Sequence, residues 1–412
     1  MPEARGTDTG YYFRMPTSSG PPAACSAVRI SRRGATRLKE GHVWVYRSDI
    51  ISADGVAPGA LVKVTDERGK SLGTALYSSA SQIAVRMISA GPVADLPGLL
   101  RERLQAAIAY RARVVTDSDA YRVVFSEADF LPGLIVDRYN DLLSLQVLTQ
   151  AIDREPVREV VTAELNQQLK PAAIVERVDP RVRELEQLAP RSSGLIQGEK
   201  NNTIFTMNGV RFHYDALEGQ KTGAFLDQRE NYAAAAQYAR GEALDVFCYQ
   251  GGFALHLAQQ CSSVTGIDSS RPALEVADRN AALNGREIEW IEANAFDLLR
   301  DSANAGRRFD TIVIDPPAFA KSKKTLDTAL RGYKELNLRA LKMLRPGGTL
   351  ITCSCSYHVS LADFMEVVAD SARDMHRTLR VLETRSQARD HPILLTVPET
   401  AYLKCLIFGV SY

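Results

Sequence analysis

The sequence has 412 residues, of which 45% are hydrophobic and 24% are charged, an ordinary globular composition. This length exceeds what one hydrophobic core supports, so we expect two or three domains. No stretch approaches the roughly 20 apolar residues that cross a bilayer, which excludes a membrane-spanning helix. The net charge of +1 gives no overall signature of nucleic-acid binding, so any affinity for RNA must come from local basic patches.

Residues 1–25 are small, polar and rich in proline, and they contain no continuous apolar segment. We therefore expect a disordered tail and no secretory signal. The six cysteines form no CxxC pair and no disulfide framework, which indicates reduced thiols in a cytoplasmic protein. The six histidines are scattered along the chain, so we expect no metal site.

Residues 26–93 predict a small all-β barrel, because short alternating runs are separated by turn residues. The first turn of this barrel collects these basic residues: Arg29, Arg32, Arg33, Arg37, Lys39 and Arg47. They face a single acid, Glu40, and a solvated surface is the default interpretation of such a run. Because His42, Trp44 and Tyr46 interleave with the charges, we favour an RNA-binding surface of stacking rings and phosphate contacts.

Residues 94–205 predict a second, α+β domain. Apolar positions recur at helical spacing at 97–114 and 154–169, which indicates two helices. Two strands meet at an Asn140-Asp141 turn, and a further strand is expected at 172–177. We find no catalytic constellation in this part.

From residue 206 to 412, apolar strands alternate with helical stretches. This order predicts an α/β fold with a mostly parallel sheet and helices on both faces. In such a fold, ligands bind beyond the carboxyl ends of the strands. The expected strands are 243–247, 263–268, 288–293, 311–315 and 349–353.

The first of these strands is followed by a glycine-containing turn, in the sequence D-V-F-C-Y-Q-G-G-F. Gly251 and Gly252 allow the backbone to pass close to a ligand just before a helix. Asp268 ends the next strand and can accept hydrogen bonds from ribose hydroxyls. Nicotinamide enzymes share this order, but G-x-G-x-x-G is absent, and Asp245 suits a cofactor with an amino group. A mere tight turn is the alternative interpretation.

The segment D-P-P-A-F follows the fourth strand, and its two prolines stiffen the loop. Asp315 can bond to the polar edge of a base, and Phe319 offers a stacking face for a nucleotide taken out of its stack. The alternative is a proline-rich loop that carries a core phenylalanine.

The stretch I-T-C-S-C-S-Y-H-V at 351–359 places two thiols at the end of a buried strand. A thiolate that adds to C6 of a pyrimidine activates C5 for methylation. Alternation puts Cys353 and Cys355 on one face of the strand, so spacing alone does not choose between them. A core position fits Cys353 better, because the strand should already be ending at Cys355.

The chain beyond its tail resembles the RlmI-type 23S rRNA cytosine-C5 methyltransferases. The matching stretches are 125–139, 221–231, 245–253, 314–323, 354–356 and 390–404. The resemblance implies an N-terminal PUA RNA-binding domain, a small β-rich middle domain and a Rossmann-like class I methyltransferase domain. It also implies S-adenosylmethionine as cofactor, 23S rRNA or a large-subunit precursor as partner, and often a homodimer.

The resemblance implies roles for individual residues. Cys355, which is followed by serine as in relatives, is the expected nucleophile, and Asp315 is expected to engage N3 and the exocyclic amine of cytosine. The expected cofactor residues are Asp245, Cys248, Tyr249, Gln250, Gly251, Gly252, Asp268, Asn294, Ala295, Asp315, Thr222, Gln228 and Arg229. The expected RNA contacts are Phe319, Arg32, Arg33, Arg37, Lys39 and Trp44. Many relatives carry a second cysteine where this chain has Pro317 and Ala318, which leaves the base that removes the C5 proton unassigned.

Two alternatives stay open from the sequence. The same fold could methylate a guanine or adenine nitrogen, for which no covalent adduct is needed. The chain could instead be a non-catalytic RNA-binding ribosome assembly factor with a vestigial cofactor pocket. A nicotinamide oxidoreductase is a distant third.

Overall fold

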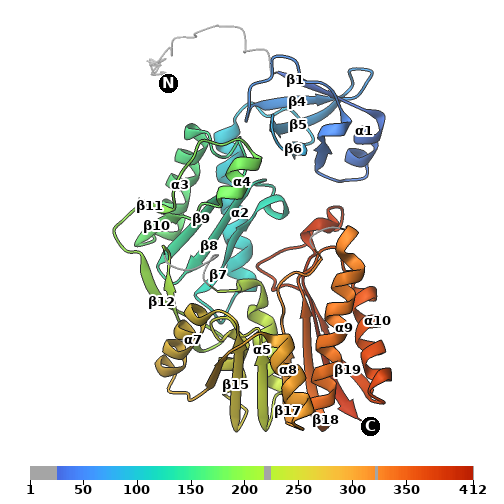
Figure 1. Ribbon diagram of the computed structural model, residues 1–412. Helices are drawn as coiled ribbons and strands as arrows, with labels where there is room; N and C mark the ends of the chain where they lie inside the picture. The colour runs from blue at the N-terminus through green and yellow to red at the C-terminus, as the bar shows by residue number, and fades with distance from the viewer. Residues whose placement is uncertain (1–25, 218–223, 321–322, 412) are drawn as a thin grey trace, which may run out of the picture.

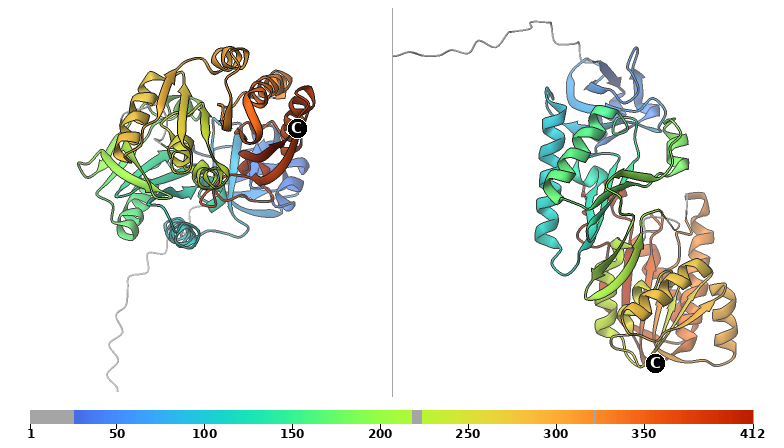
Figure 2. Two further views of the ribbon diagram at one scale, coloured as in Figure 1. Left: turned by 90° about the horizontal axis from the view of Figure 1, so that it is seen from below. Right: turned by 90° about the vertical axis from the view of Figure 1, so that its left-hand side faces the viewer.

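The computed structural model describes residues 26–217, 224–320 and 323–411. The tail expected at 1–25 lies outside the described residues. In the described residues, sheets of six, five and seven strands follow one another along an elongated molecule, with the N-terminal sheet at one end and the C-terminal sheet at the other (Figures 1 and 2). A two-stranded sheet lies between the second and the third. Within the described ranges, no helix is both long enough and apolar enough to cross a membrane.

The N-terminal part is a six-stranded sheet in the order β2-β6-β5-β4-β1-β3. Its strands are β1 Ala27–Ile30, β2 Trp44–Tyr46, β3 Ile50–Ser52, β4 Leu61–Thr65, β5 Ser71–Tyr77 and β6 Ile83–Ser89. The expected β-rich, PUA-like part is confirmed, but it is not all-β, because Arg32, Arg33, Arg37 and Lys39 lie on helix α1, Arg32–Lys39, and not in a turn. The other two basic residues lie elsewhere, Arg29 on β1 and Arg47 just after β2. Ser31 caps this helix by accepting a hydrogen bond from the Gly34 amide, and Gly34 and Ala35 pack inward.

The middle part is a five-stranded sheet in the order β11-β10-β9-β8-β7, packed against two long helices. The strands are β7 Ala120–Phe125, β8 Leu134–Tyr139, β9 Leu142–Val147, β10 Ala173–Glu176 and β11 Gly194–Gln197. The helices are α2 Leu96–Val114, α3 Glu155–Leu169 and α4 Pro180–Leu185. The predicted helices and the predicted turn at Asn140 are confirmed; Asn140 adopts a φ of 52°, as tight hairpins require.

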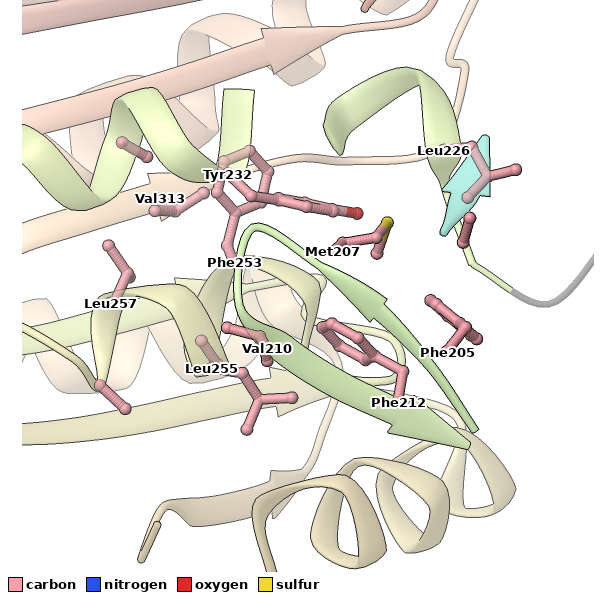
Figure 3. Close-up of a cluster of buried hydrophobic side chains, with 14 of the residues drawn as sticks. Phe205, Met207, Val210, Phe212, Leu226, Tyr232, Phe253, Leu255, Leu257 and Val313 are labelled. Atoms are coloured by element: carbon pink, nitrogen blue, oxygen red, sulfur yellow. The ribbon is translucent and has the colours of Figure 1, made fainter. Parts of the chain in front are cut away.

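A hairpin joins the middle part to the C-terminal part. It consists of β12, Asn202–Met207, and β13, Val210–Asp215, so the expected boundary at 205/206 falls inside β12. Side chains of the hairpin pack toward Tyr232, Phe253 and Leu255 of the C-terminal part (Figure 3). Phe205 also contacts Tyr139 of β8 at a ring distance of 5.3 Å. The hairpin therefore belongs to both cores.

The C-terminal part is a seven-stranded sheet in the order β16-β15-β14-β17-β18-β20-β19, parallel except for the pairings of β20. Its strands are β14 Glu242–Val246, β15 Ser263–Asp268, β16 Glu289–Glu292, β17 Phe309–Ile314, β18 Leu344–Ser354, β19 Thr378–Arg385 and β20 Lys404–Ser411. Helices α5 Arg229–Tyr238, α6 Gly252–Leu257 and α7 Arg271–Leu283 share one core. Helices α8 Ala295–Asn304, α9 Leu326–Met343 and α10 Leu361–Asp374 share the other. The predicted α/β class and all five predicted strands are confirmed.

A buried carboxylate holds the middle and C-terminal parts together. Asp390 is fully buried, and its Oδ1 lies 3.1 Å from the Arg229 guanidinium. Its Oδ2 accepts a hydrogen bond of 2.8 Å from the Arg122 amide of β7, and its carbonyl accepts one of 2.9 Å from Arg111 of α2. These contacts tie the loop before β20 to the middle sheet and fix how the two parts meet.

Candidate functional site

A cavity of about 1550 Å³ lies where the β12–β13 hairpin meets the carboxyl ends of the C-terminal strands. The hairpin side of its wall includes Asn202, Thr203, Ile204, His213, Tyr214 and Asp215. The strand-end side includes Phe247, Tyr249, Gln250, Asp268, Asp315 and Cys355. Pockets for one small molecule usually span about 300–1,000 Å³, so this cavity has room for two ligands side by side.

Cys355 and Asp315 lie on the wall of this cavity, each as the first residue after its strand. Strands β17 and β18 are hydrogen-bonded parallel neighbours, so their ends lie at the same edge of the sheet. The Cys355 Sγ lies 3.9 Å from the carbonyl oxygen of Pro316. The structure thus brings the two predicted catalytic residues together.

The two candidate thiols have different surroundings. Cys353 is fully buried opposite Cys405 in the β18–β20 pairing, and burial raises the pKa of its thiol well above the ordinary range. Cys355 follows the end of the strand, is partly exposed and faces the cavity. A nucleophile must reach its substrate as a thiolate, so the geometry favours Cys355.

Buried hydroxyl groups fix the backbone on both sides of Cys355. The Ser354 hydroxyl donates to the Tyr333 hydroxyl at 2.9 Å, and the Tyr333 and Ser356 hydroxyls lie 3.0 Å apart. The Ser356 hydroxyl also accepts from the Ala320 amide at 3.1 Å, which connects it to the end of the D-P-P loop. This network holds the thiol loop and the carboxylate loop in a fixed relation.

The electrostatics of Asp315 suit proton exchange near neutral pH. Burial raises the pKa of this carboxyl to about 7, and the nearby Asp227 carboxylate raises it further. A hydrogen bond of 3.0 Å from the Gln228 amide opposes the shift. Asp227 in turn accepts a hydrogen bond of 2.7 Å from the Tyr402 hydroxyl. Asp315 therefore populates both its neutral and its ionised forms at neutral pH.

The turn after β14 carries two non-glycine residues in the left-handed region. Phe247 and Tyr249 have φ angles of 67° and 49°, a conformation that costs free energy and persists only where the surroundings enforce it. The Phe247 and Cys248 amides both donate to the Ile267 carbonyl, at 2.9 and 3.0 Å. The strained turn places the backbone and side chains of Phe247, Tyr249 and Gln250 on the cavity wall.

Glycine is required at Gly251 and Gly252, the two predicted positions that follow this turn. Gly251 has a φ of 86°, and a Cβ at Gly252 would lie 2.5 Å from the Tyr232 ring. The chain therefore passes close to neighbouring groups just where helix α6 begins.

Asp245 has an unsatisfied oxygen. Its Oδ2 accepts from the Ala254 amide at 2.8 Å, whereas Oδ1 is buried without a hydrogen-bond partner among the described residues. Burial, together with the nearby Asp315 and Asp268 carboxylates, raises the pKa of Asp245 to about 8. A cationic ligand group would satisfy this oxygen and stabilise the ionised form. The site thus fits the amino group of a bound amino acid, although Asp245 is not itself among the residues of the cavity wall.

Asp268 ends β15 and lines the cavity. Its two carboxylate oxygens accept hydrogen bonds from the Tyr249 and Ser270 amides, at 2.9 and 2.8 Å. These bonds fix the carboxylate while leaving further lone pairs for ligand hydroxyls. Asp245 and Asp268 together fit a cofactor that carries an ammonium group and a ribose.

Other predicted cofactor residues do not reach the described cavity wall. The Asn294 side chain caps α8 by accepting from the Phe296 amide at 2.9 Å, and Ala295 is buried in the core. Arg229 is buried, and its guanidinium is engaged by carboxylates, including Asp390. Thr222 lies outside the described residues.

The predicted stacking role of Phe319 is not supported by its position. Its ring lies 4.9 Å from the Tyr333 ring and 6.1 Å from the Phe296 ring, within the core that contains α9. Pro317 and Ala318 line the cavity in its place. Contact with two aromatic rings stabilises this half-buried apolar side chain more than exposure at the cavity wall would.

The basic residues of α1 are partly neutralised by an acid that the sequence interpretation left out. Asp49 is buried and lies 2.7 Å from the Arg33 guanidinium and 3.0 Å from that of Arg37. Arg32, Arg33 and Arg37 nevertheless line a shallow cavity of about 460 Å³, and Lys39 is exposed at the end of the helix. The Trp44 indole is half-buried and donates to Glu127 of the middle part at 3.0 Å.

Sequence reasoning assigned no role to three residues near the site: Asp227, Tyr402 and Lys404. All three lie inside stretches that carried the family resemblance, 221–231 and 390–404. The acidic, phenolic and cationic side chains in those stretches are the sequence feature that could have identified these three residues. The proximity of Tyr402 and Lys404 to Cys355 depends on how β20 pairs with β18, and that of Asp227 to Asp315 depends on how the segment before α5 packs. The sequence pattern specified neither arrangement.

Comparisons with known proteins agree with this geometry. A family model described as an S-adenosylmethionine-dependent methyltransferase matches residues 167–409, and a PUA-like domain model matches residues 28–90. The structure superposes on the crystal structure of SMU.776 complexed with SAH with a TM-score of 0.80. That likeness covers 93% of this chain and 99% of the other at 18% identity, so it supports the fold alone.

Relatives of known name cover almost the whole sequence. A protein of Shewanella denitrificans named ribosomal RNA large subunit methyltransferase I is 38% identical over 398 residues, which span 93% of this chain and 100% of the relative. A protein of Tolumonas auensis with the same name is 39% identical over 395 residues, which span 93% and 98%. The chain therefore belongs to the family of S-adenosylmethionine-dependent methyltransferases that includes these relatives.

Proposed function

We propose that this protein methylates C5 of a cytosine in large-subunit (23S) ribosomal RNA through a covalent adduct with Cys355. The observation that carries the proposal is the placement of Cys355 and Asp315 on one cavity wall, at the ends of neighbouring strands. Methylation of a nitrogen needs no thiol at this position, whereas C5 of cytosine is unreactive until a nucleophile adds to C6.

The choice of RNA as substrate rests on two findings. The matched relatives are named for large-subunit ribosomal RNA, and the N-terminal part matches a PUA-like model. We propose that residues 26–93 dock the RNA, with Arg32, Arg33, Arg37 and Lys39 contacting phosphates. The Trp44 indole donates a hydrogen bond to Glu127. We therefore propose that Trp44 orients the docking part and does not stack on a base.

The bond changes at the base follow from these residues. The Cys355 thiolate forms a bond to C6, and the C5–C6 π electrons shift through C4 toward N3. Asp315 in its neutral form gives a proton to N3, which leaves C5 as an enamine-like carbon. S-adenosylmethionine, when bound, would supply an electrophilic methyl group to C5 and would retain the electron pair of its carbon–sulfur bond.

The cycle closes by elimination. A base removes the C5 proton, the C5–C6 double bond re-forms, and the electron pair of the carbon–sulfur bond returns to Cys355. The proton on N3 returns to Asp315, so the residue ends in the form in which it began. The D-P-P loop offers Pro317 and Ala318 to the cavity and no second cysteine, so water is the proposed acceptor of the C5 proton.

Asp315 suits this role because its two protonation states lie close in free energy. With a pKa of about 7, the carboxyl can give a proton to N3 and take it back without a large energetic penalty in either direction. The Gln228 amide holds its Oδ2, which leaves the other oxygen for the base.

Mass spectrometry of nucleosides from large-subunit rRNA tests the proposal. Cells that lack the gene should lose one 5-methylcytidine, and a plasmid copy should restore it. A copy with Cys355→Ser should not restore it, whereas the matched variant Cys353→Ser should. Loss of a methylated guanine or adenine, or full restoration by Cys355→Ser, would refute C5 methylation through this thiol.

A further inference from the structure

Lys404 places a buried positive charge next to the thiol loop. The residue is the first of β20 and lies opposite Ser354 of β18 in the strand register. Its side chain is buried, and its Nζ donates to the carbonyl of Ser356 at 2.7 Å and to that of Tyr402 at 2.8 Å. Ser356 directly follows Cys355, so the ammonium group is anchored to the backbone that carries the thiol.

This cation lacks an acidic partner in the described part of the chain, where no carboxylate lies within ion-pair distance of it. An ammonium group has three N–H donors, and two carbonyl groups accept from two of them. Buried charges are costly unless they are paired. Burial lowers the pKa of Lys404 to about 8, and the negative charge of ionised Cys355 opposes that shift.

Among the described residues, the titratable and charged groups around Cys355 include two carboxylates, whose effect on a thiolate a cation would offset. These groups are Asp315 after β17, Asp227 before α5, Tyr333 on α9, Tyr402 before β20 and Arg122 on β7. Both carboxylates, when ionised, disfavour a second negative charge nearby. Arg122 is bonded to the Asp137 carboxylate at 2.8 Å, which neutralises it. Burial raises the pKa of Tyr333 and that of Tyr402, so both phenols are neutral at physiological pH.

We propose that Lys404 is a positioning residue that keeps Cys355 in its thiolate form. The inference rests on the proposed function, because it assigns how that function's nucleophile is activated. In the ionisation step the sulfur–hydrogen bond breaks, the electron pair stays on sulfur, and the proton passes to water through the open cavity. Lys404 remains an ammonium group and stabilises the sulfur anion through its charge.

Alkylation of Cys355 by iodoacetamide, without RNA or cofactor, tests the proposal. The rate is followed from pH 6 to pH 9.5 by mass spectrometry of the peptide that contains Cys355. The wild-type protein should reach half its maximal rate below pH 8, whereas an ordinary cysteine needs about pH 8.5. Lys404→Gln, whose amide can still donate to a carbonyl, should react about tenfold more slowly at pH 7 and recover at pH 9.5.

Two controls separate charge from structure. Lys404→Arg keeps the charge and should stay within about threefold of the wild type. Lys334→Met removes a partly exposed lysine paired with Asp374 and should leave the rate unchanged. Equal rates for Lys404→Gln and the wild type across the pH range would overturn the proposal. If Lys404→Gln does not fold, a wild-type half-maximal rate at pH 8.5 or above would overturn it equally.

The alkylation experiment can fail without refuting the proposed function, and the proposed function can fail without changing the alkylation result. Alkylation measures only the state of the thiol, so a failed Lys404 experiment leaves C5 methylation intact. Nucleoside analysis that finds a methylated nitrogen would remove the proposed function whatever the alkylation rates are. If the proposed function and the role of Lys404 are both correct, Lys404→Gln should lower kcat at pH 7 with little change in KM. This loss of kcat should shrink as the pH rises toward 9.

Discussion

The unsatisfied carboxylate of Asp245 should make the stability of the ligand-free protein depend on pH. Its pKa rises from an ordinary 3.8 to about 8 on folding, because burial penalises the ionised form. Between pH 3.8 and about pH 8, the Asp245 carboxyl is protonated in the folded state and ionised in the unfolded state. The free energy of unfolding must therefore fall as the pH rises through this window, and the penalty is complete above pH 8.

The magnitude follows from the shift. From pH 5 to pH 8 the wild type should lose about 1.4 kcal/mol of stability per pH unit on account of this carboxyl, or about 4 kcal/mol in all. Asp245→Asn cannot ionise and should lack this loss, so it should become the more stable protein at high pH. Asp245→Asn should also abolish binding of S-adenosylmethionine, because it cannot pair with the ammonium group.

Urea denaturation at pH 5, 7 and 9, followed by tryptophan fluorescence, measures the difference. Asp278→Asn, on an exposed position of α7, is the matched control and should follow the wild type at each pH. Parallel stability curves for Asp245→Asn and the wild type, within about 1 kcal/mol, would refute the reasoning, as would calorimetry that finds undiminished cofactor binding.

Three further predictions concern other parts of the chain. Asp315→Asn should slow single-turnover methyl transfer by about 10²–10⁴ and remove the decline in rate through pH 7 that loss of the acid form causes; an unchanged pH profile would contradict this. Asp390→Asn breaks a buried ion pair with Arg229 and should lower the free energy of unfolding by about 3–5 kcal/mol in urea titrations; a loss below 1 kcal/mol would be inconsistent with the structure. Arg32→Glu should weaken RNA binding and reduce the slope of log K against log salt by about 1 in filter-binding assays, whereas an equal slope would place the RNA elsewhere.

The sequence pattern predicted the C-terminal fold well because its strands are continuous apolar runs and its helices are amphipathic. It failed at α1, an arginine-rich helix whose only contacts with the core among its described residues come from the small buried residues Gly34 and Ala35 and the partly buried Leu38. The expected boundary at 205/206 falls inside β12. The hairpin there alternates like any edge strand, and only the tertiary packing shows that Phe205 serves two cores.

Some residues of the candidate site could likewise be predicted from the sequence, and others could not. Residues directly after strands, such as Asp268, Asp315 and Cys355, could be predicted because strand ends converge at one edge of a parallel sheet. Phe319 and Arg229 could not, since the direction of a side chain in a loop or at the start of a helix depends on neighbours distant in sequence. An aromatic ring or an arginine beside a site is as easily used for packing as for binding.

A trapped adduct tests the central claim most directly. An RNA fragment that carries 5-fluorocytidine at the target position, incubated with S-adenosylmethionine, blocks the final elimination because C5 then holds no proton to remove. The account predicts a stable protein–RNA complex whose cross-linked peptide contains Cys355, formed equally by Cys353→Ser and not at all by Cys355→Ser. Methyl transfer to the unmodified RNA without any such complex, or a cross-link at another residue, would contradict it.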